Sequence, residues 1–372
     1  MAREVEFRKA TREDDGELRR ILREYPSGGD VSLRIEKEPG YFEASEVEGD
    51  NDRVLVALDA ETKRVVGVGA FYEKQSFVNG EAAWVGYLSN LRIEPAYRGG
   101  RVLVAGYKEA KKLYEEQRSQ LYLTTIMDDN VIAKRALTSG REGLPAYRDL
   151  GIFNTLILGV RRNPWAEAPV GVRVRAAREE DVAAIVEFWN GEGRRRQFFP
   201  SYSAENLLSS AGLLRGLSPG DLHIALDDKG ICGTAAIWDQ TSFRQWVIDS
   251  YSRRAGLLRY PYNAYARATG RPTFPPAGTA LDYRFLGLVC IRDDVAGVLE
   301  GLCRSAWAAL AETSPGALVI AGFHRRDPLG RPFLALPNTL FRSRIYVVHW
   351  PDGEADFAAL DDGIPYLEVG SL

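Results

Sequence analysis

Two arginines and two glycines stand together in the stretch SNLRIEPAYRGGRVLVAGYKEAKKL, which runs from Ser89 to Leu113. The pattern predicts a strand that ends near Ile93, a tight turn at residues 98–101 and a helix that follows. A helix N-terminus carries unpaired N–H groups and a partial positive charge, and glycine lets a ligand approach the backbone closely. These residues therefore indicate either a cradle for a phosphate group or a surface turn with solvated arginines.

The other residues that could carry chemistry are few. The chain has 372 residues, a net charge of −3, three cysteines and three histidines. The histidines have no partner at the spacing of metal ligands, so we expect no metal site. Few cysteines, odd in number, fit a reducing compartment better than a disulfide framework, so we expect a cytoplasmic protein. The cysteines and histidines are Cys232, Cys290, Cys303, His223, His324 and His349.

Composition also limits the partners. The small net charge of −3 gives no general attraction to nucleic acid or to an anionic membrane. No apolar run approaches the ~20 residues that a membrane-spanning helix needs. The opening stretch MAREVEFRKATRED is charged throughout and lacks the apolar core of a signal peptide, so we expect no leader. We therefore expect no membrane partner.

An internal repeat divides the chain. FRKATREDDGEL at 7–18 matches VRAAREEDVAAI at 174–185, and VALDAETKRVVGVGAFY from Val56 parallels IALDDKGICGTAAIW from Ile224. Each first segment reads as a strand that turns into a helix with acids in its first turn, and each second segment as a hairpin. We infer two copies of one fold: residues 1–162 and 171–372, joined by a proline-containing linker at 163–170.

The first copy alternates strands and helices. The periodicity predicts the order β-α-β-β-β-α-β-α-β-β, a mixed sheet with helices on both faces, which is an α/β fold. The long strand 82–93 precedes the glycine turn, and helices are expected at 102–116 and 130–137.

This order, with a strand that feeds an Arg-Gly turn and a helix, resembles the GNAT superfamily of acyl-CoA-dependent N-acyltransferases. The family motif places Arg or Gln, two residues, Gly, one residue, then Gly or Ala; here Arg98 takes the first position, and Arg101 and Leu103 take the glycine positions. The helix after the next strand often begins with Asn and carries Ala three residues later, as Asn130 and Ala133 do here. The tyrosine that often follows seven residues after that Asn is Leu137.

The resemblance implies a binding site for acetyl-CoA or a larger acyl-CoA. The pyrophosphate would lie on the N–H groups of residues 98–103, the pantetheine arm along the long strand, and Asn130 would bind the pantetheine amides or only cap its helix. The expected cofactor-binding residues are Leu91, Arg92, Ile93, Arg98, Gly99, Gly100, Arg101, Val102, Leu103 and Asn130.

Acyl transfer to an amine also needs proton acceptors and donors. Glu81, Tyr87 and Ser89 are candidates for the base, because they stand on or beside the long strand. In the family a tyrosine frequently protonates the departing thiolate; Tyr147 is a candidate to replace it here. Glu81 and Tyr87 are equally compatible with a hairpin charge and a core tyrosine.

The second copy lacks the glycine turn. Its equivalent stretch, CIRDDVAGVLEGLCRSAWAAL, places Asp293 and Asp294 at the helix start, where they would repel a pyrophosphate. We infer that this copy has lost CoA binding. An insertion at 251–275 has five arginines, five aromatic residues and no acids, which suits an ordered insertion, a lid over an anionic substrate or, less well, a nucleic-acid contact.

The sequence therefore predicts an N-acyltransferase that moves an acyl group, expected to be acetyl, from CoA to an amine of a small molecule or peptide. The alternative is a catalytically silent protein that uses the same scaffold to bind a ligand.

Overall fold

The computed structural model describes residues 4–26, 30–50, 53–98, 100–115, 118–160, 163–269 and 271–372. Within them, twelve strands form one mixed sheet in the order β1-β3-β4-β5-β6-β14-β7-β13-β12-β10-β9-β8. The strands are β1 Val5–Lys9, β2 Val31–Glu36, β3 Val54–Asp59, β4 Val65–Val78, β5 Glu81–Ile93, β6 Tyr122–Met127, β7 Ala146–Gly159, β8 Arg173–Ala176, β9 Leu222–Asp227, β10 Gly230–Trp238, β11 Gln245–Tyr251, β12 Tyr283–Ile291, β13 Leu318–His324 and β14 Thr339–His349.

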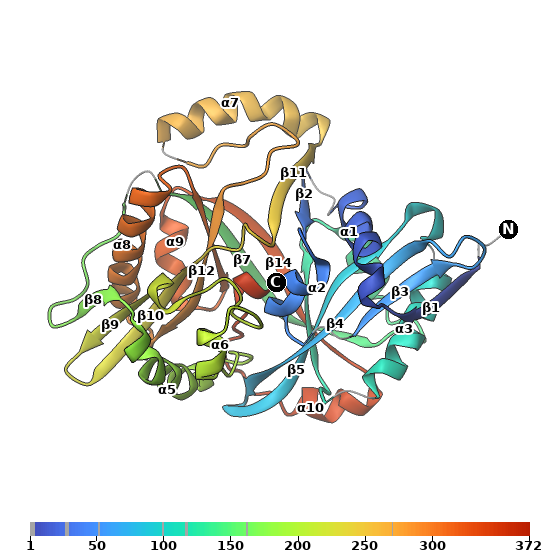
Figure 1. Ribbon diagram of the computed structural model, residues 1–372, viewed down its shortest axis with the longest axis horizontal. Coiled ribbons are helices and arrows are strands. Elements are labelled where there is room, and N and C mark those ends of the chain that lie inside the picture. Colours follow the sequence, from blue (N-terminus) through green and yellow to red (C-terminus); the bar gives the residue numbers. More distant parts are fainter. Residues whose placement is uncertain are drawn as a thin grey trace.

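Helices lie around this sheet (Figure 1). They are α1 Asp15–Glu24, α2 Tyr41–Ser45, α3 Gly100–Tyr114, α4 Val131–Leu137, α5 Val182–Glu192, α6 Ala204–Leu208, α7 Arg253–Thr269, α8 Ala296–Thr313, α9 Arg331–Ala335 and α10 Glu354–Ala358. No helix in the described ranges is both long and apolar enough to cross a bilayer.

The first half follows the expected order closely. The hairpin expected at 53–72 is β3 and β4, and the long strand is β5. The helix after the glycine turn is α3, and it begins at Gly100. Local pattern predicts these elements, since the apolar stripe of a helix matches its buried face and the apolar run of β3 is buried throughout. Helix α1, for example, buries Leu18, Ile21 and Leu22, whose spacing places them on one side.

The two halves repeat each other in space as well as in sequence. The run β1-β3-β4-β5-β6 forms one end of the sheet, and β8-β9-β10-β12-β13 forms the other in the corresponding order. In each run the fourth and fifth strands are parallel and the others antiparallel. This spatial repeat supports the proposal that a linker at 163–170 divides the chain into two copies of one fold.

The last strand of each half lies beside the other half. Strand β14 pairs with β6, and β7 pairs with β13, while β7 and β14 pair with each other along eleven registered positions. Twelve of the described strands therefore form one continuous sheet through the middle of the molecule (Figure 1).

Two features were not expected from the sequence. Strands β2 and β11, one from each half, form a separate antiparallel pair. The segment 364–372 runs into the centre of the molecule, where the C mark lies in Figure 1, and Leu367 and Val369 join the main hydrophobic core.

Candidate active site

Strands β5 and β6 separate from each other in the middle of the first half. Their parallel pairing covers only Gly86 opposite Tyr122 and Tyr87 opposite Leu123. Gly86 is needed there, since a Cβ on it would lie 2.1 Å from the Tyr122 ring. Beyond this point the two strands diverge and leave an opening in the sheet.

A bulge in β5 shapes the opening. The β4–β5 register steps from Val68 opposite Arg92 to Ala70 opposite Ser89, so β5 carries one extra residue. Asn90 adopts a positive φ of 56° at this point. Its Nδ2 donates to the hydroxyl oxygens of Tyr72 at 3.1 Å and Tyr41 at 3.3 Å, which holds the bulge against the core.

A cavity of about 380 Å³ occupies the opening. Its wall is built by β5 from Tyr87 to Ile93, by α3 and α4, and by residues of the second half. Arg244, Trp246 and Leu372 line it from that second half, so the cavity reaches from the α3 side to the centre of the molecule.

Six of the expected CoA-binding residues line this cavity: Leu91, Arg92, Ile93, Val102, Leu103 and Asn130. Gly100 begins α3, and Arg101 is exposed in its first turn and does not line the cavity. Gly99 lies outside the described residues. The structure therefore brings together the strand and helix that the sequence predicted, and leaves the two arginines of the turn at the surface.

Arg98 does not have the place that the sequence suggested. Its backbone N–H donates to Pro95 O at 3.2 Å, and its Nε donates to Ile93 O at 3.0 Å. Because this N–H already has an acceptor, we restrict the expected phosphate cradle to the first turn of α3 from Gly100 to Leu103.

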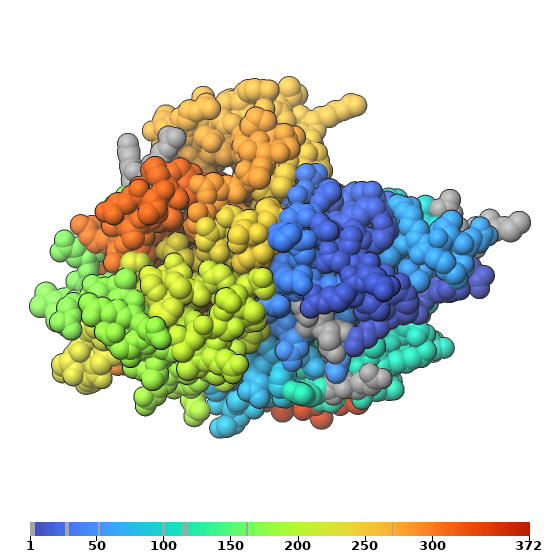
Figure 2. Space-filling view, in the orientation of Figure 1, coloured from blue at the N-terminus to red at the C-terminus, as the bar shows by residue number. Residues whose placement is uncertain are grey.

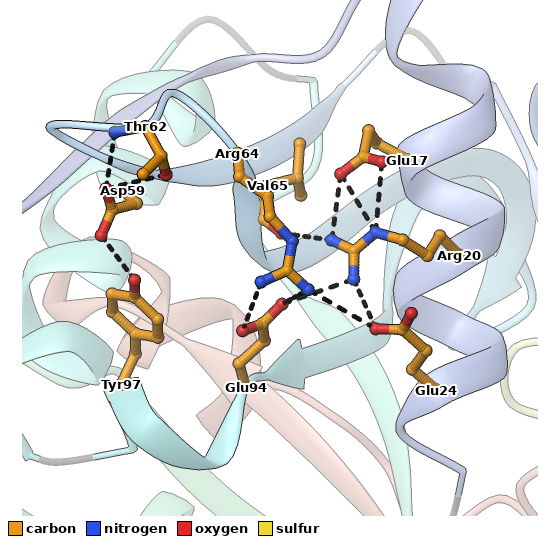
Figure 3. Close-up of polar contacts among 9 residues, drawn as sticks. All are labelled: Glu17, Arg20, Glu24, Asp59, Thr62, Arg64, Val65, Glu94 and Tyr97. Carbon is orange, nitrogen blue, oxygen red and sulfur yellow. Dashed lines mark hydrogen bonds and ion pairs between the residues drawn. The ribbon is translucent and has the colours of Figure 1, made fainter.

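The turn before α3 is held by two groups of contacts (Figure 3). Glu94, 5% exposed, lies 2.8 Å from Arg64 Nη2 and 3.4 Å from Arg20 Nη1. Arg20 also donates to Val65 O at 2.6 Å. These contacts tie the end of β5 to α1 and to the start of β4.

The second group fixes Tyr97, the last residue before Arg98. Its hydroxyl donates to Asp59 Oδ2 at 2.5 Å, and Asp59 Oδ1 accepts from the Thr62 N–H at 2.7 Å and from its hydroxyl at 2.9 Å. The Tyr97 hydroxyl and the Thr62 groups hold the pKa of Asp59 far below its ordinary range. An anchored turn positions the start of α3 without using the cavity residues.

Asn130 caps α4. Its side-chain oxygen accepts from the Ala133 N–H at 3.0 Å, as in a standard N-cap. Since it also lines the cavity, its Nδ2 is the group that can donate to a ligand.

The candidate acids and bases are not together. Glu81 is exposed at the tip of the β4–β5 hairpin, opposite Val78, and does not line the cavity. It stands six positions before Tyr87, which is roughly 20 Å along a strand. Glu81 is therefore not part of the cavity, because β5 carries it to the far end of the hairpin.

Two of the proposed tyrosines do line the cavity. Burial raises the pKa of Tyr87 to about 12, and its hydroxyl lies 3.5 Å from Thr125 Oγ1. Tyr147 shares a 2.5 Å hydrogen bond with the hydroxyl of Tyr107 on α3. Burial raises the pKa of Tyr107 to about 12 and that of Tyr147 well above its ordinary value. Tyr107 and Tyr147 are therefore protonated at neutral pH, and Leu137 lines the same cavity.

Sequence reasoning missed a buried polar cluster beside the cavity. Lys37 Nζ donates to Ser45 Oγ at 2.8 Å and is ion-paired with Glu48, both groups being 1% exposed. Arg244, which lines the cavity, has its Nη2 4.0 Å from Glu48 Oε1. No motif could have revealed this cluster, since its members come from separate segments of both halves.

The charges of this cluster depend on each other. Burial lowers the pKa of Lys37 to about 8, although Glu48 opposes the shift. Burial alone would raise the pKa of Glu48, but Lys37 and Arg244 hold it below its ordinary value, and the hydroxyl of Ser89 acts in the same direction. Ser89 lines the cavity, so it connects the cavity to a buried carboxylate.

The structure shows no group of three His, Cys, Asp or Glu side chains placed to hold a metal ion within its described ranges. Cys232, Cys290 and Cys303 are buried thiols, none of them in a disulfide.

Comparisons with known proteins support a fold assignment. No family model and no curated protein sequence matches the chain. Among solved structures, Saccharomyces cerevisiae N-myristoyltransferase with bound myristoyl-CoA superposes with a TM-score of 0.59 over 98% of this chain and 85% of that chain, at 12% identity. A GCN5-related N-acetyltransferase from Sphaerobacter thermophilus gives 0.52 over 99% and 98%, at 12% identity.

A protein from Enterococcus faecalis described as a probable N-acyltransferase gives a TM-score of 0.51 over 92% of this chain and 72% of that chain, at 10% identity. These similarities extend over nearly the whole chain, including both halves of the sheet. At such low identities they establish the fold, and activity has to be argued from the site. The chain therefore has the same fold as these N-myristoyltransferase and GCN5-related N-acetyltransferase structures.

Proposed function

We propose that this protein is an acyl-CoA-dependent N-acyltransferase with one active site, in its first half. The observation that carries the proposal is the cavity of about 380 Å³ that passes through the opened sheet. It joins the first turn of a helix, suited to a phosphate, to a buried polar cluster, suited to an amine acceptor.

The α3 side would hold the CoA moiety. Since β6 leaves β5 after Tyr87, the backbone of Leu91–Ile93 faces the cavity, and its polar groups can pair with an extended pantetheine arm. The first turn of α3, whose residues include no acid, would receive the pyrophosphate. Asn130 would add a side-chain donor.

The acyl group would lie in the same cavity. Ala57, Gly67 and Gly69 contribute small residues to its wall, and a Cβ on Gly69 would meet only Leu91 Cδ1 within 4 Å, at 3.9 Å. Acetyl-CoA is the donor that the sequence favours, and the small side chains on this wall leave room for a larger acyl group.

The acceptor amine would approach from the centre of the molecule. It attacks the thioester carbonyl carbon, the C–N bond forms and the C–S bond breaks. A backbone N–H near Leu91 would stabilise the developing oxyanion. In place of Glu81, Ser89 would relay the amine's proton: its hydroxyl oxygen accepts that proton while its own proton passes to the Glu48 carboxylate.

Nearby cations prepare this end for a neutral amine. Arg92 and Arg244 line the cavity here, and Lys37 lies near enough to interact with both. Nearby cations lower the pKa of a bound amine because they disfavour its protonated form. The leaving thiolate would then receive the hydroxyl proton of Tyr147, which the hydrogen bond to Tyr107 holds in place.

Binding tests the proposal first. Calorimetric titration of the full chain with CoA and acetyl-CoA is expected to give saturable binding that Arg101→Glu weakens about tenfold or more, because it puts a negative charge in the first turn of α3. The matched control is Lys111→Glu at the other end of the same helix, which we expect to bind like the wild type. Equal affinities for both variants would contradict a phosphate site at α3.

Turnover tests the second step. Release of CoA thiol, followed with acetyl-CoA and longer acyl-CoAs against a panel of small amines and peptides, is expected to be catalytic. Tyr147→Phe should lower kcat by on the order of 100-fold and leave acyl-CoA affinity unchanged. Tyr346→Phe is the control, since this buried tyrosine packs on Tyr147 at 5.9 Å between ring centres but does not line the cavity.

A ligand-binding protein without activity is the second candidate. Leu137 lines the cavity where the family often has its tyrosine, and Arg101 and Leu103 replace motif glycines. Saturable acyl-CoA binding without thiol release for any amine of the panel would favour this candidate.

A further inference from the structure

Helix α7 lies apart from the core. Figure 1 shows it at the top of the molecule, and Figure 2 shows the same residues as a ridge on the surface. Its inner side is fastened to the irregular segment that follows it. Asn263 Nδ2 donates to Phe274 O at 2.8 Å, its Oδ1 accepts from the Phe274 N–H at 2.8 Å, and the Tyr262 ring lies 5.1 Å from that of Phe274.

The outer side of α7 exposes large apolar groups. Leu257 is 75% exposed, Leu258 53%, Tyr260 69% and Tyr265 53%. Pro261, Ala264 and Ala268 are exposed as well. At 100° per residue, most of these positions fall on one side of the helix, so an apolar stripe faces solvent where a soluble helix usually carries polar residues.

Arginines surround this stripe. Helix α7 contains Arg253, Arg254, Arg259 and Arg267 and no Asp or Glu, in a chain whose net charge is −3. Arg253, Arg254 and Arg267 are exposed near its two ends, and Arg259 lies over the rings of Tyr251 and Tyr260 at 5.4 and 4.9 Å. The apolar stripe therefore has positive charge at both ends.

The proposed active site does not explain this surface. None of the described residues of α7 lines the cavity, which excludes a direct lid over it. The inference below therefore does not depend on the proposed function.

We propose that α7 is a membrane-surface helix, which lays its outer side on an anionic lipid bilayer. Leucine side chains that point outward can enter the boundary between headgroups and acyl chains, and arginines at both ends can pair with lipid phosphates. Tyrosines are favoured at that depth because one end of each ring is apolar and the other is polar.

Charge and shape favour this occupant over others. A second copy would bring four more arginines against these four, which is repulsive. Nucleic acid would use the arginines and tyrosines, but it offers no environment for Leu257 and Leu258. The absence of a spanning segment led to the expectation of no membrane partner; a surface contact needs none.

Vesicle flotation with the full-length chain tests the proposal. Vesicles of phosphatidylcholine with phosphatidylglycerol should carry the protein, and vesicles of phosphatidylcholine alone should carry much less. Leu257→Glu with Leu258→Glu should weaken binding about tenfold or more, as should Arg253→Glu with Arg254→Glu. Leu208→Glu, which changes an equally exposed leucine (53%) on α6, is the matched control and should bind like the wild type.

All of the substituted positions are exposed, so we expect the variants to fold like the wild type. Circular dichroism and Tm check this, and both should equal the wild-type values. Three results would overturn the proposal: equal flotation with both kinds of vesicle, equal flotation of the leucine variant and the wild type, or loss of flotation in the control. Binding of a single-stranded RNA probe that ignores the leucine change would instead assign the surface to nucleic acid, and dimerisation that this change abolishes would assign it to self-association.

Discussion

Matched residues of the two halves make matched contacts. Arg8 Nη1 lies 2.7 Å from Asp14 Oδ2, and Arg175 Nη1 lies 2.7 Å from Asp181 Oδ2. Each aspartate also accepts, at 2.8 Å, from the backbone N–H three residues before it, that of Thr11 or Arg178. The repeated sequence therefore forms the same contact in both halves: an ion pair that fixes the first turn of a helix to the preceding strand.

These two aspartates predict how stability depends on pH. The hydrogen-bonded arginine lowers the pKa of Asp14, and likewise of Asp181, relative to the unfolded chain. Their stabilisation is therefore present above the ordinary carboxyl pKa of about 3.9 and is lost as pH falls through the lowered folded values. Asp14→Asn and Asp181→Asn should each cost about 1 kcal/mol at pH 7, a modest amount because the arginines are partly exposed.

Urea unfolding at several pH values measures this. At pH 7 the free energy of unfolding of the wild type should exceed that of each variant, and this gap should shrink as pH falls below about 4. Glu180→Gln is the control, because Glu180 is 71% exposed and should show no gap at any pH. A gap that stayed constant into acid would mean that the aspartates act through shape and not through charge.

At the scale of residues, the sequence predicted the site residues that lie close together along the chain. Leu91, Arg92, Ile93, Val102 and Leu103 line the cavity because one strand and the helix after it carry them, and a short stretch fixes that arrangement. The cluster of Lys37, Glu48 and Arg244 could not be predicted, since tertiary packing alone brings those segments together. Glu81 was misplaced for the opposite reason: it is near the site in sequence and far from it along the strand.

At the scale of elements, one bulge opens the sheet and occurs twice. In β12 the register with β10 steps from Thr234 opposite Cys290 to Ala236 opposite Gly287, which again gives the strand beside the opening one extra residue. Leu288 has a φ of 52° there, close to the 56° of Asn90 in β5. Asn and Leu share no chemical property that would reveal a bulge. The sequence therefore predicted both strands but not the bulge in either of them.

The bulge in β5 should control ligand affinity. Asn90→Val places a β-branched side chain at a positive φ, which costs on the order of 1–3 kcal/mol, and removes the bonds to Tyr41 and Tyr72. The strand should relax toward regular pairing, narrow the opening and weaken CoA binding about tenfold.

Asn90→Gly is the matched variant, because it also removes the side-chain bonds but adopts a positive φ freely. We expect it to bind CoA within a few-fold of the wild type. If calorimetry gives the same loss for both variants, the side-chain bonds and not the backbone hold the opening.

At the scale of the whole molecule, the halves differ in what occupies their openings. Strands β12 and β13 are paired from Tyr283 to Leu286 and then separate, as β5 and β6 do. There the chain fills its own gap: Glu368 Oε2 accepts from the Leu288 N–H at 2.8 Å and from the Tyr366 hydroxyl at 2.6 Å. The cavity beside Cys290 has a volume of about 20 Å³, room for roughly one water, against about 380 Å³ in the first half.

The helix start of the second half is occupied as well. Asp294, which precedes α8, pairs with Arg196 at 2.6 Å, and Arg196 also lies 3.2 Å from Asp327. The sequence predicted the acids at this helix start but neither the segment that fills the gap nor the exchange of β7 and β14, because contacts so distant along the chain leave no local pattern.

These differences predict one ligand per chain. Calorimetric titration of the full chain with CoA should give a stoichiometry near one, since the second opening is filled by Glu368 and its neighbours, and its helix start carries bound carboxylates that repel a phosphate. Arg101→Glu should lower the affinity for the whole of the CoA that binds, and not for one of two bound equivalents. Two equivalents bound, or a wild-type-like site that persists in Arg101→Glu, would show that the segment 364–372 gives way to ligand. Glu368→Lys would then decide where the second equivalent binds, because a cation in that gap should raise the affinity of a site located there and leave a site at α3 unchanged.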